Sequence, residues 1–191
     1  IQSNVVSWYA SHPAEPIKGV CVSEHYARFE GPREQTGNVP PQAVHPQRLL
    51  ETLTELRLHA DDIGPYHLAP FIPSLGEIPK EDTSPVTGLQ KILARCGTTH
   101  AAITHLLEHE EWDFSAVYYE AIDHVGHAFM QYHPPRMTHV DEKLYERYKG
   151  CVTGIYRFHD MMLDRLLQLA GDDTTVIICS DHGFLNDHLR P

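Results

Sequence analysis

Two stretches, FSAVYYEAIDHVGH at residues 114–127 and TTVIICSDHG at residues 174–183, point to the fold class. The first opens with a run rich in aromatic and apolar residues, and the second with an apolar run rich in β-branched residues, both typical of buried strands. Between them, apolar residues recur every three or four positions over 142–170, as on one long amphipathic helix. The sequence therefore predicts a β-α-β unit over 114–179, with parallel strands and a right-handed crossover.

The rest of the chain adds strands and helices to this unit. Short strands are predicted near residues 4–10 and 19–23, and helices over 46–59 and 86–110, the latter broken near Gly97. Residues 24–85 are polar and rich in Gly and Pro, so we interpret them as an insertion or cap. We expect one α/β domain over 1–191, with a central, mainly parallel sheet flanked by helices.

Composition excludes several classes of function. The chain has 15 Lys and Arg against 26 Asp and Glu, a net charge of −11, which disfavours coating a nucleic acid. No apolar run is long enough to cross a membrane. Four widely spaced cysteines without a Cys-x-x-Cys pair favour a reducing compartment, so we expect a soluble, cytoplasmic protein.

Candidate metal ligands follow both predicted strands of the β-α-β unit. Asp123 and His127 have helical i, i+4 spacing, and Asp181 and His182 are adjacent. Ligands gather beyond the carboxyl ends of parallel strands, and mixed Asp and His ligands suit Zn²⁺, with Mn²⁺ as the alternative. Taken singly, either pair is better explained as an ordinary hydrogen-bonded or solvated contact. Their conjunction, each after an apolar strand of one β-α-β unit, is more specific and makes a site with two divalent ions as good an explanation as the ordinary one.

These residues also carry a family resemblance. Asp-x-x-Gly-His at 123–127 and Ser-Asp-His-Gly-Phe at 180–184 resemble motifs of the alkaline phosphatase superfamily, particularly its type I phosphodiesterase and nucleotide pyrophosphatase branch. The resemblance implies an alkaline-phosphatase-like fold. It also implies that Asp123 and His127 bind one metal ion, while Asp181 and His182 bind the other.

The same resemblance implies that the chain is an internal fragment. The family's first-strand Asp ligand and its Thr or Ser nucleophile are expected upstream of residue 1, so the catalytic residue is unknown here. A further His ligand is expected beyond Pro191, although His188 is a weaker candidate for such a role. We therefore expect the fragment alone to be inactive.

For the parent protein, we expect a metal-dependent phosphoester hydrolase, either a phosphodiesterase or a phosphatase, acting by a two-metal mechanism. Its substrate would be a small phosphorylated molecule, for instance a nucleotide. The alternatives are a phosphotransferase, mutase or sulfatase of the same superfamily, and a non-catalytic domain that lacks the nucleophile. The sequence does not indicate an oligomeric state.

Overall fold

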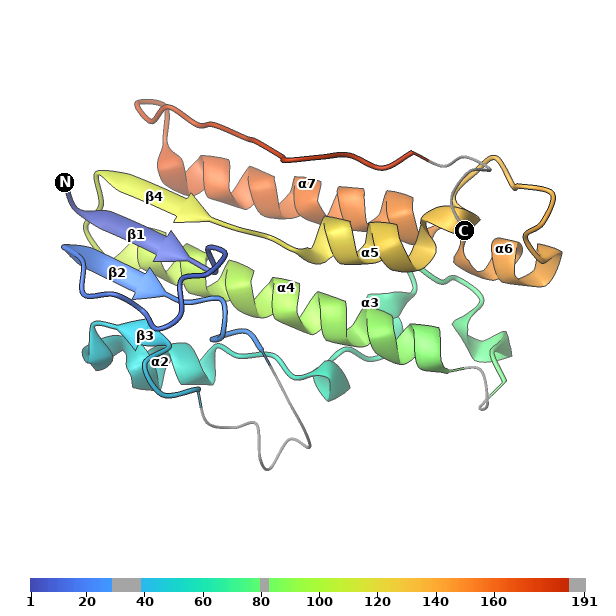
Figure 1. The fold of residues 1–191 in the computed structure, drawn as a ribbon, viewed down its shortest axis with the longest axis horizontal. Helices are drawn as coiled ribbons and strands as arrows, with labels where there is room; N and C mark the ends of the chain where they lie inside the picture. Colours follow the sequence, from blue (N-terminus) through green and yellow to red (C-terminus); the bar gives the residue numbers. More distant parts are fainter. Residues whose placement is uncertain (29–38, 80–82, 186–191) are drawn as a thin grey trace.

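The computed structural model describes residues 1–28, 39–79 and 83–185. Its centre is a four-stranded sheet in the order β3-β2-β1-β4 (Figure 1). The strands are β1 (Ser3–Val6), β2 (Gly19–Val22), β3 (Val44–His45) and β4 (Phe114–Val117). β1 runs parallel to β2 and β4, while β3 is antiparallel to β2. The predicted α/β class, with a mainly parallel sheet flanked by helices, is confirmed.

The register of the sheet brings three strand ends to one edge. Val6 lies opposite both Val22 and Val117, so β1, β2 and β4 end at the same level. Residues that directly follow these strands therefore meet, although they are far apart in the sequence. This edge carries the polar groups described below.

Three longer helices pack beside the sheet: α4 (Ser84–His109), α5 (Ala121–Phe129) and α7 (Cys151–Ala170). One hydrophobic cluster joins the strands to α4 and to α2 (Leu50–Glu55), and includes Val6, Leu53 and Leu106. The other lies among α4, α5 and α7 and includes Phe71, Val125 and Ile155. Because α4 contributes to both clusters, it ties the two parts of the core together.

Shorter elements complete the described chain. They are α3 (Pro65–Leu68), α6 (Glu142–Tyr148) and 3₁₀ turns at Gln47–Leu49, Ala60–Asp62, Leu75–Glu77 and Met130–Tyr132. The predicted helix over 46–59 is thus a 3₁₀ turn followed by the short helix α2. The described parts of 24–85 supply β3 to the sheet and Phe71 to the core. Their role as an insertion or cap stays a prediction.

Two helix predictions are wrong in detail. α4 is continuous through Gly97, where a Cβ would come within 2.7 Å of Leu58 Cδ1. This glycine therefore allows close packing and does not break the helix. The helix expected over 142–170 is divided into α6 and α7 at Gly150, where a Cβ would lie 3.0 Å from the Phe71 carbonyl oxygen.

The predicted strand over 174–179 is not formed. Figure 1 draws this segment as an extended trace, and within the described chain β4 pairs with β1 alone. Ile177 and Ile178 are 82% and 72% exposed, and Cys179 is exposed as well. The prediction was wrong because an apolar run becomes a strand only where a neighbouring strand completes its hydrogen bonds. The β-α-β unit consequently lacks its second strand here.

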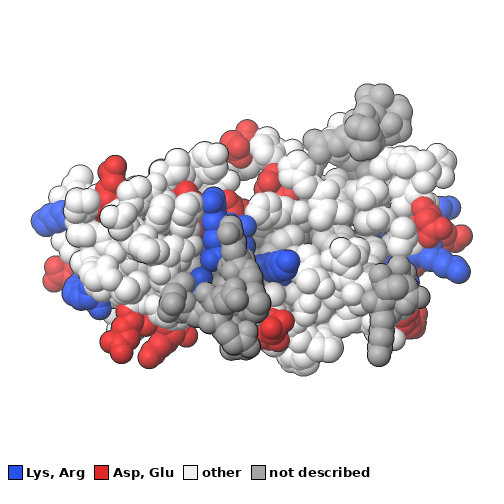
Figure 2. Space-filling model, turned by 60° about the horizontal axis from the view of Figure 1, so that its bottom comes forward, with Lys and Arg blue, Asp and Glu red and all other residues white. Residues whose placement is uncertain are grey.

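The surface carries both acidic and basic side chains. On the face shown in Figure 2, acidic and basic side chains are interspersed among uncharged ones. Among the described residues, no helix combines the length and the apolar character that crossing a membrane requires.

Candidate functional site

The four predicted metal ligands lie together beyond the carboxyl end of β4, and we call them the ligand cluster. Asp123 and His127 share one face of α5 because they are four residues apart. Asp123 Oδ1 lies 3.4 Å from His127 Nε2 and 3.5 Å from His182 Nε2. Asp181 Oδ2 lies 3.9 Å from His182 Nε2. The structure thus places Asp123 between the two imidazoles, one from each motif.

The burial and hydrogen bonding of the Asp123 carboxylate are compatible with a role as a metal ligand. Its Oδ1 atom is buried and has no hydrogen-bond partner. A buried acceptor that makes no hydrogen bond costs about 1–3 kcal/mol. The imidazoles at 3.4 and 3.5 Å, and equally a bound cation, would offset this cost. A carboxylate with two imidazoles is also a donor set that suits Zn²⁺. Within the described ranges, however, no three His, Cys, Asp or Glu side chains are placed so that they could hold a metal ion together, so the ligand cluster would have to rearrange and gain further ligands to bind one.

Phe184 holds the second motif against the first. Its ring packs edge-on against the imidazoles of His127 and His182, with centroid separations of 5.2 and 5.5 Å. It lies directly over Gly126, where a Cβ would come within 2.5 Å of the ring. The glycine in Asp-x-x-Gly-His therefore has a packing role, because it leaves room for the phenylalanine in Ser-Asp-His-Gly-Phe.

A small polar pocket adjoins the ligand cluster at the same edge of the sheet. Its polar lining consists of Ser7 after β1, Glu24 after β2, Tyr118, Glu120 and His124 after β4, and Arg95 and Thr99 from α4. In the sheet, β2 and β3 lie on one side of β1, whereas β4 lies on the other side, so the strand order reverses at β1. Such a topological switch point is where open α/β sheets bind ligands. His124 lines this polar pocket, and its neighbour Asp123 belongs to the ligand cluster.

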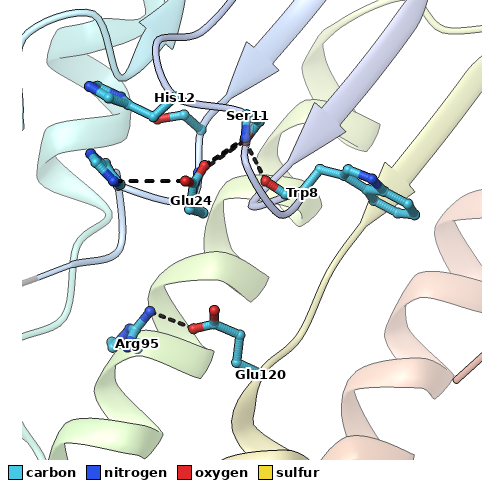
Figure 3. A network of polar contacts seen from close by, with 8 residues as sticks. Trp8, Ser11, His12, Glu24, Arg95 and Glu120 are labelled. Carbon is cyan, nitrogen blue, oxygen red and sulfur yellow. Dashed lines mark hydrogen bonds and ion pairs between the residues drawn. The ribbon is translucent and has the colours of Figure 1, made fainter. Parts of the chain in front are cut away.

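Glu24 is the most buried charged group of the polar pocket. Its Oε2 accepts hydrogen bonds from the Ser11 backbone N–H and the Ser11 hydroxyl, both at 2.9 Å (Figure 3). Burial acts to raise the pKa of Glu24, but these bonds outweigh it and lower the pKa below its usual value. Glu24 is therefore ionised at neutral pH.

The other side of the polar pocket carries a salt bridge and an aromatic group. Arg95 pairs with Glu120, and Figure 3 shows this pair apart from the Glu24 network. Tyr118 contacts Trp8 edge-on at 6.3 Å between centroids. Burial, followed by the charges of Glu120, Asp181 and Asp123, raises the pKa of Tyr118.

Sequence reasoning missed the polar pocket. Glu24, Arg95 and Glu120 belong to no recognisable motif. The available signal was positional, because Ser7, Glu24 and Glu120 all come shortly after strands. The weaker candidate ligand His188 and the closing residues 187–191 lie outside the described residues.

Comparisons with known proteins identify the family of the chain. No curated protein and no solved structure matches the chain significantly. The model of one family, described as type I phosphodiesterase / nucleotide pyrophosphatase, matches residues 3–187, which is nearly the whole sequence. The chain therefore belongs to the type I phosphodiesterase / nucleotide pyrophosphatase family, within the alkaline phosphatase superfamily.

Proposed function

We propose that this chain supplies part of the active site of a phosphoester hydrolase that uses two divalent metal ions, Zn²⁺ or alternatively Mn²⁺. One observation carries the proposal: the buried Oδ1 of Asp123, which makes no hydrogen bond, lies within 3.5 Å of imidazole nitrogens from both motifs. Membership of a phosphodiesterase family supports the reaction class. The metal dependence rests on the ligand cluster.

The four ligands have distinct proposed roles. Asp123 and His127 would hold one ion, while Asp181 and His182 would hold the other. When bound, such ions lower the pKa of the attacking hydroxyl and stabilise the charge on the leaving oxygen. The contact between Asp123 and His182 supports two neighbouring ions, because it joins a ligand of each. The attacking group is proposed to be a Thr or Ser outside residues 1–191.

The substrate is proposed to be a small phosphodiester or pyrophosphate, such as a nucleotide derivative, in keeping with the family description. A phosphomonoester is the alternative. The acidic net charge does not oppose binding of such an anion, because bound metal ions would set the local field.

Hydrolysis of two chromogenic esters tests the proposal. The full-length parent protein would be assayed on bis-p-nitrophenyl phosphate and p-nitrophenyl phosphate, with Zn²⁺ or Mn²⁺ added. Asp123→Asn and Asp181→Ala should each reduce turnover at least about 100-fold, since each removes a charge from the ion's ligand set. Asp173→Asn, in the exposed turn that precedes the segment 174–179, is the matched control and should retain activity because Asp173 belongs to neither motif.

Three outcomes have different meanings. Metal-dependent cleavage of the diester that is lost in both variants supports a phosphodiesterase, while preference for the monoester indicates a phosphatase. If neither ester is cleaved under any metal condition, the hydrolase proposal is wrong. Zn²⁺ binding measured by calorimetry then tells whether the ligand cluster still binds metal.

A further inference from the structure

The charges in the polar pocket do not balance. It contains two carboxylates, Glu24 and Glu120, and one guanidinium, Arg95, which is paired with Glu120. Among the described residues, Glu24 has only imidazoles as possible counter-charges: His25, whose Nε2 is 3.7 Å from Oε1, and His12, which stacks on His25. The polar pocket therefore has a net charge of about −1 when its imidazoles are neutral, and this charge resides on Glu24.

Glu24 also has unused capacity to accept hydrogen bonds. Both hydrogen bonds from Ser11 go to Oε2 of Glu24, which leaves Oε1 without one from Ser11. The side chain of Glu24 is only 9% exposed. An ionised carboxylate can accept about four hydrogen bonds, and one that is buried without a counter-charge is costly. The site therefore favours a ligand that brings both positive charge and N–H donors.

The form of the polar pocket limits the size of that ligand. The enclosed space accommodates a group about the size of a water molecule. A protonated primary amine is of this size, whereas a quaternary ammonium or a sugar ring is much larger. Ser7 and Thr99 line the same space, and their hydroxyls, 3.1 Å apart, are further acceptors for an ammonium group.

We propose that the polar pocket binds the primary ammonium group of an amino-alcohol phosphoester, with Glu24 as its counter-charge. The phosphoester part of this statement rests on the proposed function, whereas the ammonium part does not. The pocket and the ligand cluster are one residue apart along α5, at His124 and Asp123. In this proposal, the amine of a short amino-alcohol lies at Glu24 and its phosphate extends toward the ligand cluster.

The ammonium part is tested first with probes that lack phosphate. Amide NMR signals of the purified protein are followed during titration with methylammonium and with methanol, its neutral counterpart of equal size. We expect methylammonium to shift the signals of Ser7, Glu24 and Thr99, and methanol to leave them unchanged. In Glu24→Gln, the affinity for methylammonium should fall roughly 10- to 100-fold, as expected for loss of a charged hydrogen bond.

Glu111→Gln, an exposed carboxylate at the other end of α4, is the matched control and should bind methylammonium like the wild type. Unchanged spectra outside the polar pocket show that Glu24→Gln is folded. Equal shifts from methanol and methylammonium, or equal affinity in Glu24→Gln, would overturn the ammonium proposal.

The phosphoester part is tested with 2-aminoethyl phosphate, 2-hydroxyethyl phosphate and ethyl phosphate in the presence of Zn²⁺. The aminoethyl compound should bind at least tenfold more tightly than the other two, and Glu24→Gln should abolish only this difference. Binding of methylammonium without this preference would show that the amine and phosphate sites are not used together. If the preference is observed but no phosphoester is hydrolysed, the proposed function fails while the amine site stands.

Discussion

At the scale of single residues, Gly126 controls how closely the two ligand motifs approach. A Cβ at this position would lie 2.5 Å from Phe184, whose ring contacts both His127 and His182. We expect Gly126→Ala to displace Phe184 and His182, and to weaken Zn²⁺ binding about 10- to 100-fold, as is typical for a residue that orients metal ligands. Calorimetric titration with Zn²⁺ measures this change.

Gly88→Ala provides the comparison, because a Cβ at Gly88 on α4 meets no atom within 4 Å. There the substitution should raise the free energy of unfolding by up to about 1 kcal/mol through helix propensity, and leave Zn²⁺ binding unchanged. Wild-type Zn²⁺ affinity in Gly126→Ala would show that Phe184 does not position His182.

At the scale of elements, α7 packs on the core through a glycine. A Cβ at Gly154 would come within 2.7 Å of the ring of Phe71, which is 4% exposed and has little freedom to move. We expect Gly154→Ala to lower the free energy of unfolding by about 1–3 kcal/mol through overpacking, against the gain in helix propensity. Urea denaturation measures the change. Thr153→Ala, exposed on the same helix, should stay within about 0.5 kcal/mol of wild type.

The segment 174–179 illustrates the opposite case, an apolar element without a partner. Within the described chain, the amides of residues 175–179 donate no backbone hydrogen bond. We expect these amides to exchange with deuterium far faster than those of β1, which is hydrogen-bonded on both sides. Hydrogen exchange followed by mass spectrometry tests this expectation. Protection equal to that of β1 would mean that the segment is paired after all.

At the scale of the whole molecule, the sequence pattern predicted the features that depend on neighbouring residues and missed those that depend on contacts between distant segments. The places of β1, β2 and β4 and the spacing of Asp123 and His127 were readable, because β-propensity and helical periodicity depend on neighbours in the sequence. The ends of two strands were predicted wrongly, since β1 ends at Val6 and not at residue 10, and β4 ends at Val117 and not at residue 120. The continuity of α4 was not, since Leu58, distant in sequence, sets the role of Gly97. The polar pocket was not readable either, because Glu24 follows β2 and Arg95 lies on α4, and only the fold brings them to the same pocket.

Two half-buried histidines, His100 on α4 and His159 on α7, make the stability of the fold depend on pH. His100 Nδ1 lies 2.9 Å from the Tyr119 hydroxyl, and His159 Nδ1 lies 3.0 Å from the Ile155 carbonyl oxygen. Burial lowers the pKa of both below the usual 6.5, and for His100 the charges of His159 and Arg165 act in the same direction. Burial also lowers the pKa of His12 and His105.

Because these histidines bind protons more readily in the unfolded chain, protonation favours unfolding. Their contribution to stability is complete above pH 6.5 and is lost as the pH falls through their lower folded-state pKa values. The lowered pKa values of Glu24 and Glu110 act separately, below 4.5. We therefore expect the melting temperature, measured without added metal, to fall between pH 7 and about pH 5. His159→Gln cannot be protonated, so it should reduce this slope, whereas an unchanged slope would assign the pH dependence to other groups.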